Sequence, residues 1–176
     1  MGTEINLGVI FDGELEGGGG FQTQLSTIIE VGELSHCSIK AFVFSKKNKS
    51  LLESLNIECV FVKQKKSDKF LRIFNNQGWF ERISRRFKIK TFFEKKLDEN
   101  KIDLVYFLSP SLLALDLISH NYIFTIWDLC HRDYPEFPEV NYFREFEKRE
   151  NLYQRAAKKA IAVLTDSELG RENSIR

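Results

Sequence analysis

The sequence predicts a doubly wound α/β domain in which a mainly parallel sheet of six or seven strands carries helices on both faces. Short apolar runs alternate with amphipathic segments along the chain, and a glycine cluster directly follows the first run. The length of 176 residues suits one domain with a real core. Hydrophobic residues at 43% and charged residues at 29% exclude a mostly disordered chain.

The first strand–turn–helix unit is expected between residues 5 and 32. Its opening run, Ile5–Phe11, is short, β-branched and closed by Asp12-Gly13, which is typical of a buried strand. Glycines occupy positions 17–20, and apolar side chains then recur at the spacing of one helix face. Strand, glycine turn and helix therefore follow one another directly.

The later elements alternate in the same way. Strands are predicted at residues 39–44, 58–62, 103–108, 122–126 and 160–164, and helices at 50–55, over a basic and aromatic stretch ending near Asn100, and at 144–155. Thr165-Asp166-Ser167-Glu168 has the form of a capping box, so another helix should begin there. Because the chain stops at Arg176, soon after this start, we expect it to be one domain of a longer protein.

Membrane-spanning and secreted proteins are disfavoured. No apolar run approaches the ~20 residues of a membrane helix, and the N-terminus leads into a strand instead of a signal peptide. The three cysteines, Cys37, Cys59 and Cys130, are an odd number at wide spacings and favour reduced thiols. We expect a cytoplasmic protein, held at most peripherally at the inner face of the membrane.

The glycine turn is a candidate ligand site. Its amides and the following helix N-terminus could approach a phosphate, although a flexible loop without a ligand would have the same composition. A dinucleotide site is disfavoured because the fingerprint needs a glycine where Phe21 or Gln22 stands, and the second strand ends in Ser45-Lys46 without an acid. The chain also lacks the Gly-Lys-Ser/Thr of a P-loop.

A second candidate site is the dense polar segment 125–137, which leaves the carboxyl end of a predicted strand. It could line a ligand crevice, or it could be a solvated loop with ion pairs. Asp128, His131 and Asp133 match no standard metal-ligand spacing, so no metal is expected. Ser109-Pro110-Ser111 lacks the nucleophile elbow of a serine hydrolase.

In their order and spacing, these motifs resemble the N-terminal domain of glycosyltransferase family 4, and the resemblance covers the chain from end to end. It implies a Rossmann-like domain of a GT-B enzyme, whose second, C-terminal domain would bind a nucleotide-sugar donor. Such enzymes retain anomeric configuration and usually need no metal, because amides and basic side chains stabilise the leaving diphosphate. The resemblance therefore implies no cofactor besides the donor substrate. It is carried by Gly17-Gly18-Gly19-Gly20, Thr125-Ile126-Trp127-Asp128-Leu129, Tyr134-Pro135-Glu136-Phe137, and residues 144–155 and 160–168.

The resemblance also assigns roles, with one departure. Trp127 stands where many members have a histidine that contacts the reacting sugar. Either His131 takes over that contact, or Trp127 stacks on a sugar face while Asp128 orients the acceptor; His131 could also be an ordinary loop histidine. The expected catalytic residues are Asp128 and His131, the donor-binding residues Gly18, Gly19 and Gly20, and the acceptor-binding residues Trp127, Arg132, Glu136 and Ser109.

The segment from Lys63 to Lys96 holds twelve Lys or Arg residues against three acids, a net charge of +9. Arg82, Arg85 and Arg86, interleaved with aromatics, could contact an anionic membrane surface that presents a lipid-linked or glycan acceptor. Alternatively the aromatics face the core and the cations face water. Nucleic acid is not an expected partner, because no recognised binding module accompanies the charge.

A rival hypothesis makes the chain a non-catalytic α/β domain that docks on a membrane or a protein partner. It predicts no coding sequence beyond Arg176, whereas the transferase hypothesis predicts a second domain.

Overall fold

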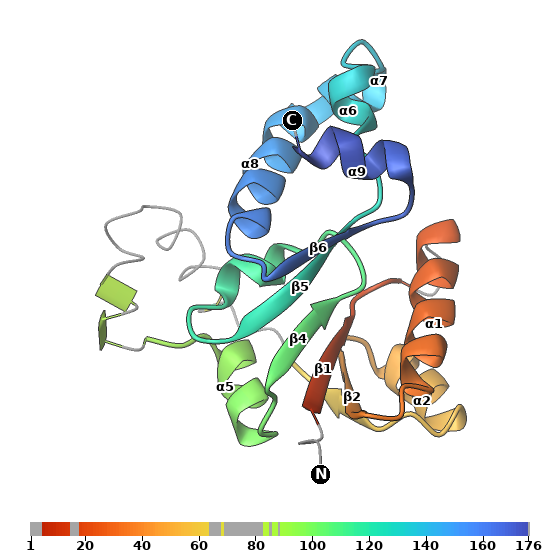
Figure 1. The fold of residues 1–176 in the computed structure, drawn as a ribbon, viewed down its shortest axis with the longest axis vertical. Coiled ribbons are helices and arrows are strands. Elements are labelled where there is room, and N and C mark those ends of the chain that lie inside the picture. The colour runs from red at the N-terminus through yellow and green to blue at the C-terminus, as the bar shows by residue number, and fades with distance from the viewer. Residues whose placement is uncertain are drawn as a thin grey trace.

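The computed structural model describes residues 5–14, 18–63, 68, 83, 84, 86, 87 and 89–175, and it leaves out the side chains of residues 139, 141 and 175. These residues form an α/β fold around one six-stranded, all-parallel sheet (Figure 1). The strand order is β3-β2-β1-β4-β5-β6, which is the order of doubly wound nucleotide-binding folds. The strands are β1 (Ile5–Phe11), β2 (Cys37–Val43), β3 (Cys59–Phe61), β4 (Leu104–Phe107), β5 (Asn121–Ile126) and β6 (Ala162–Thr165).

Helices cover both faces of the sheet (Figure 1). One core cluster joins β1 and β2 to α1 and α2 through Phe21, Ile28 and Leu52. The other joins β4 and β5 to α5 and α8 and includes Phe93 and Leu152. The helical elements are α1 (Gly19–Gly32), α2 (Lys46–Ser54), α5 (Phe92–Glu99), η1 (Leu112–Asp116), α6 (Cys130–Asp133), α7 (Pro138–Asn141), η2 (Tyr142–Arg144), α8 (Glu145–Ala157) and α9 (Glu168–Ile175).

The expected fold class is confirmed, with six strands among the described residues, although several boundaries differ. β2 begins at Cys37 instead of residue 39, because its backbone pairs with β1 from Ile5 onward. α2 begins at Lys46 instead of residue 50, because the Ser45 hydroxyl accepts a hydrogen bond from the Lys47 amide and caps the helix. The helix expected at the end of the chain is present as α9, but it begins at Glu168, and the hydroxyl that caps it is that of Ser167, which accepts a hydrogen bond from the Gly170 amide, instead of that of Thr165.

A buried carboxylate ties α5 to the loop before β5. Glu94 is fully buried, and its Oε1 accepts hydrogen bonds from the amides of Ile118 and Ser119 at 2.9 and 2.7 Å and from the Ser119 hydroxyl. The Nδ1 atom of His120 lies 3.4 Å from the same Glu94 Oε1 atom. Burial tends to raise the pKa of Glu94, but these hydrogen bonds together hold it below its ordinary value. The carboxylate therefore stabilises the loop that leads into β5.

Most of the predicted basic and aromatic helix falls outside the described residues; within it the structure describes helical backbone at residues 68, 83, 84, 86 and 87 and in α5. Arg82 and Arg85 lie outside the described residues, whereas Arg86 is described and exposed. Among the described helices, none combines the length and the apolar composition needed to cross a membrane.

Candidate functional site

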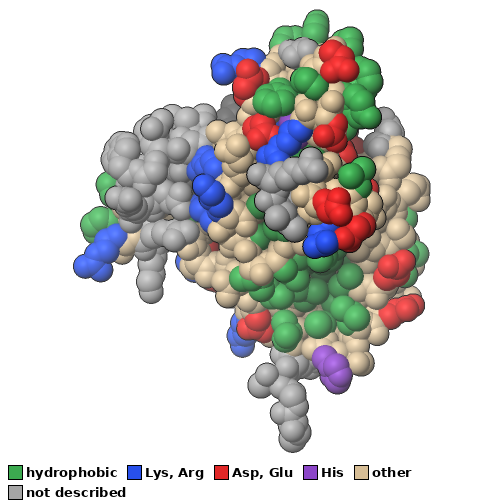
Figure 2. Space-filling model, turned by 45° about the horizontal axis from the view of Figure 1, so that its top comes forward, with side chains coloured by type: hydrophobic (Ala, Val, Ile, Leu, Met, Phe, Trp, Pro, Cys, Tyr) green, Lys and Arg blue, Asp and Glu red, His purple; other side chains and the backbone are tan. Residues whose placement is uncertain are grey.

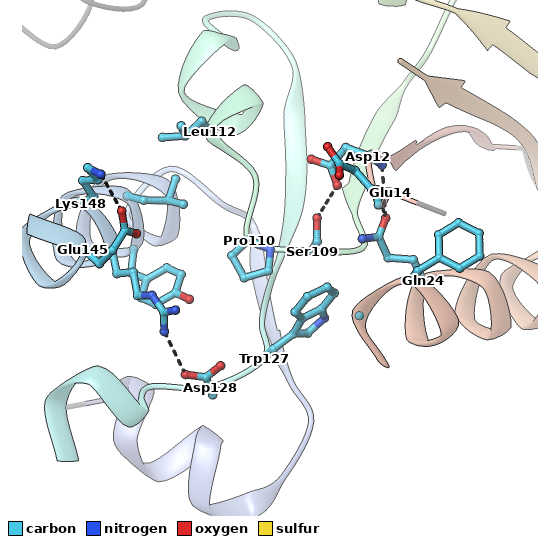
Figure 3. A pocket seen from close by; sticks show the side chains of 16 residues that line it. Asp12, Glu14, Gln24, Ser109, Pro110, Leu112, Trp127, Asp128, Glu145 and Lys148 are labelled. Atoms are coloured by element: carbon cyan, nitrogen blue, oxygen red, sulfur yellow. Dashed lines mark hydrogen bonds and ion pairs between the residues drawn. The ribbon is translucent and has the colours of Figure 1, made fainter. Parts of the chain in front are cut away.

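A cavity of about 720 Å³ opens at the carboxyl ends of β1, β4 and β5. The sheet order reverses between β1 and β4, so the chain leaves these two strands in different directions and a crevice forms between them. The turn after β1 and the segment after β5 meet in this cavity (Figure 3). Its lining residues are Asp12, Gly13, Glu14, Gly20, Phe21, Gln24, Ser109, Pro110, Leu112, Trp127, Asp128, Glu145, Lys148, Arg149, Leu152 and Tyr153.

Two buried amide side chains fix the turn after β1. Gln24 of α1 accepts hydrogen bonds from the amides of Asp12 and Gly13 through Oε1, at 3.2 and 3.1 Å. Asn48 of α2 donates to the Gly13 carbonyl at 2.7 Å. Both side chains are only 2% exposed, and a Cβ at Gly13 would lie 2.9 Å from the Gln24 amide nitrogen. The turn therefore has one well-defined position at the cavity wall.

Asp12 is linked to the strand on the other side of the switch point. Ser109 follows β4, and its hydroxyl donates a hydrogen bond of 2.6 Å to Asp12 Oδ1. Ser109 is buried, whereas Asp12 is partly exposed and lines the cavity (Figure 3). A carboxylate accepts more than one hydrogen bond, so Asp12 can hold Ser109 and a ligand at the same time.

Trp127 lies between the two sides of the cavity (Figure 3). Its indole Nε1 donates to the Leu108 carbonyl at 3.1 Å, which fixes the ring. The far edge of the ring lies against α1, because a Cβ built on Gly20 would be 2.9 Å from two of its carbons. Gly18, which precedes the helix, has φ +62° and ψ −134°, a conformation that L side chains rarely adopt. Glycines at 18 and 20 thus let the chain turn and let the indole approach α1.

The first turn of α1 has no side-chain cap and no acidic residue. Amides at such a helix start are available to a ligand. Of the three expected donor-binding glycines, Gly20 lines the cavity. Gly18 and Gly19 lie at the start of the helix and are not among the lining residues.

The α8 side of the cavity carries its charges as ion pairs (Figure 3). Arg149 Nη1 lies 3.6 Å from Asp128 Oδ1, and Lys148 is paired with Glu145. Asp128 also accepts hydrogen bonds from the amide and the thiol of Cys130, and the thiol hydrogen bond raises the pKa of Cys130 above its ordinary value. Asp128 is therefore at the cavity but is already engaged.

The structure does not bring His131 or Arg132 to the cavity wall. His131 is fully buried, with Nε2 2.9 Å from Glu150 Oε1 and its ring against Phe146 and Tyr153. Arg132 donates to both oxygens of Glu150, and this interaction is the main reason why the pKa of Glu150 lies below its ordinary value. These contacts dock α6 on α8.

The remaining acceptor candidate, Glu136, is exposed and does not line the cavity. Sequence reasoning missed Asp12 and Glu14 as site residues, although carboxylates directly after the first strand could have indicated them. It also missed Gln24 and Arg149, which look like ordinary polar positions of helices.

In the described part of the chain, no three His, Cys, Asp or Glu side chains are grouped so that they could hold a metal ion. No protein-family model matches this chain, and no curated protein was found to be related to it.

Proposed function

We propose that this chain is the N-terminal, acceptor-side domain of a GT-B glycosyltransferase resembling family 4, which transfers a sugar from a nucleotide-sugar donor to a glycan or lipid-linked acceptor. The transfer would retain anomeric configuration and need no metal, in the synthesis of a surface polysaccharide or glycoconjugate. One observation carries the proposal: a single cavity at the switch point joins the turn after β1, the glycine start of α1 and the segment after β5. Ligands of open α/β sheets bind at this position.

The lining suits a saccharide. Trp127 offers an aromatic surface, and Asp12, Glu14 and Asp128 offer acceptors for hydroxyl groups. We assign Asp128 the role of orienting the acceptor, Trp127 that of stacking on a sugar ring, and Gly18, Gly19 and Gly20 that of approaching the donor. His131 is fully buried and bonded to Glu150 away from the cavity, so we assign it a structural role in the contact between α6 and α8 instead of a catalytic one. Ser109 positions Asp12.

The proposal is tested with the complete gene product that contains this chain. We expect it to transfer label from a nucleotide sugar to an acceptor present in a membrane extract, and we expect Asp128→Asn to lower kcat/KM at least ~100-fold. Glu30→Gln, which changes an exposed acid outside the cavity, should leave the rate unchanged. Folded protein that transfers no sugar from any nucleotide donor would refute the proposal.

A non-catalytic binding domain is the second candidate, and one surface favours it. Two pairs of exposed aromatic side chains belong to the α6–α7–η2 end of the molecule, where hydrophobic groups are visible in Figure 2. Tyr134 stacks on Phe137, and Tyr142 packs edge-on against Phe143. Exposed aromatic clusters are typical of interaction surfaces. The transferase needs a second, donor-binding domain of ~150 to 200 residues in the same gene product, whereas this candidate does not.

A further inference from the structure

The two sides of the cavity differ in charge. On the α8 side, both cations of the lining, Lys148 and Arg149, are paired with acids. On the α1 side, Asp12 and Glu14 have no cation partner within the described residues. The described lining therefore carries two acids in excess, and both belong to the turn after β1 (Figure 3).

The position of Asp12 is built by buried groups. Gln24 and Asn48 are almost fully buried, and their amides hold the backbone of the turn. The Ser109 hydroxyl occupies Asp12 Oδ1. These hydrogen bonds to the backbone of the turn and to Oδ1 give the carboxylate a fixed place. Its Oδ2 atom makes no hydrogen bond among the described residues and belongs to a side chain that lines the cavity.

An ionised carboxylate only accepts hydrogen bonds. A ligand that lies against Asp12 and Glu14 must therefore offer donors, such as hydroxyl or ammonium groups. An acidic group at the same place would be repelled, and the repulsion would be stronger than in bulk water because protein atoms partly enclose the cavity.

We propose that the cavity selects a saccharide without acidic groups, a neutral or amino sugar, and that Asp12 and Glu14 exclude uronic acids and other anionic sugars. The inference rests on the proposed function, because it names the class of sugar held by the same cavity. It goes further in assigning the discrimination to two carboxylates outside the segment 125–137.

The test is a binding titration of the 176-residue protein, followed by NMR. Three probes differ in one substituent: methyl glucoside, its 2-amino derivative, and methyl glucuronide, which has a carboxylate in place of the 6-hydroxymethyl group. The glucuronide should bind about tenfold more weakly than the glucoside, and the amino sugar at least as tightly as the glucoside. Raising the salt concentration should narrow these differences.

Substitutions of Asp12 and Glu14 test whether these two carboxylates cause the discrimination against the glucuronide. Asp12→Asn and Glu14→Gln should each reduce the discrimination against the glucuronide, and the double variant should reduce it to within about twofold. Glu14 makes no hydrogen bond with another described residue, so Glu14→Gln tests the inference even if Asp12→Asn fails to fold. Glu33→Gln, an exposed acid at the other end of α1, should change nothing.

The outcomes separate the two proposals. A glucuronide that binds as tightly as the glucoside overturns this inference and leaves the transferase proposal standing. Discrimination that persists in the folded Glu14→Gln variant, and in the double variant if it folds, also overturns the inference. If the folded protein binds none of the three probes at concentrations up to ~100 mM, this inference fails, and the transferase proposal is decided separately by the transfer assay on the complete gene product.

Discussion

Substitution of Gly20 by alanine tests the contact on which the shape of the cavity depends. The new methyl group would lie 2.9 Å from two carbons of the Trp127 ring, well inside an ordinary carbon–carbon contact of about 3.5 to 4.0 Å. The ring cannot simply retreat, because its Nε1 is hydrogen-bonded to the Leu108 carbonyl. Either that hydrogen bond breaks or the start of α1 moves.

The matched control is Gly19→Ala. A Cβ at Gly19 meets no atom of the described residues within 4 Å, and both glycines lie in the first turn of α1. Alanine stabilises a helix by up to about 1 kcal/mol relative to glycine, so Gly19→Ala should be neutral or stabilising. Gly20→Ala receives the same gain but incurs an overpacking cost of about 1 to 3 kcal/mol. We therefore expect it to be less stable than Gly19→Ala by about 1 to 3 kcal/mol.

Urea denaturation followed by circular dichroism measures this difference, and thermal unfolding should place Gly20→Ala roughly 2 to 10 °C below Gly19→Ala. The double variant Gly20→Ala/Trp127→Leu, with a smaller side chain at the contact, should lose less stability than the two single changes together. Equal stabilities for Gly19→Ala and Gly20→Ala would show that the indole does not press on α1, and the described wall of the cavity would be incorrect.

Three further predictions concern the scaffold. Glu94→Gln should lower the free energy of unfolding by about 2 to 3 kcal/mol. Because the folded pKa of Glu94 is depressed, its contribution to stability is present above the ordinary glutamate pKa and is lost as pH falls through the folded value. In urea titrations between about pH 3 and 6, the stability of the variant should therefore depend less steeply on pH than that of the unchanged protein. Lys101 has φ +54° just after α5. Lys101→Gly should therefore raise the free energy of unfolding, measured by urea denaturation, by about 1 kcal/mol, whereas Lys101→Ala should not. Arg132→Gln should raise the pKa of Glu150 toward its ordinary value in an NMR titration of carboxyl carbons, since the Arg132 hydrogen bond is the main cause of the depression.

The sequence predicted the sheet well because buried parallel strands are continuous apolar runs. Val9, Ile10 and Phe11 are fully buried, as are Phe42 and Val43 of the neighbouring strand, so composition alone marks these strands. Strand and helix ends were predicted less well. Backbone pairing extends β2 to Cys37, and a cap at Ser45 moves the start of α2, and neither effect depends on apolar periodicity.

The site was predicted in outline and not in detail. That the segments after β1 and β5 share one edge follows from parallel topology. The partnership of Asp12 with Ser109 spans 97 positions of the chain, and no local pattern indicates it. His131 lies in a polar segment, yet its ring is buried against α8, where Nε2 bonds to Glu150, and it does not line the cavity. Tertiary contacts, which spacing does not encode, therefore decide which polar residues face a ligand.

The charges of the cavity also indicate where a donor diphosphate would not bind. The start of α1 offers about half a positive charge, but Asp12 and Glu14 line the same side of the cavity. Lys148 and Arg149 are already paired with acids. A diphosphate would therefore find no free cation on the described wall, and on the proposed function its charge must be compensated by groups outside this lining.

The 176-residue chain should accordingly show no saturable binding of UDP, GDP or ADP below ~1 mM in a calorimetric titration. Asp12→Asn should strengthen any residual binding, because it removes one negative charge beside the helix start. Saturable binding in the micromolar range that Asp12→Asn leaves unchanged would place the diphosphate on this domain. The acidic turn would then lie too far from the bound ligand to influence it, and the division of the cavity into a saccharide side and an ion-paired side would be wrong.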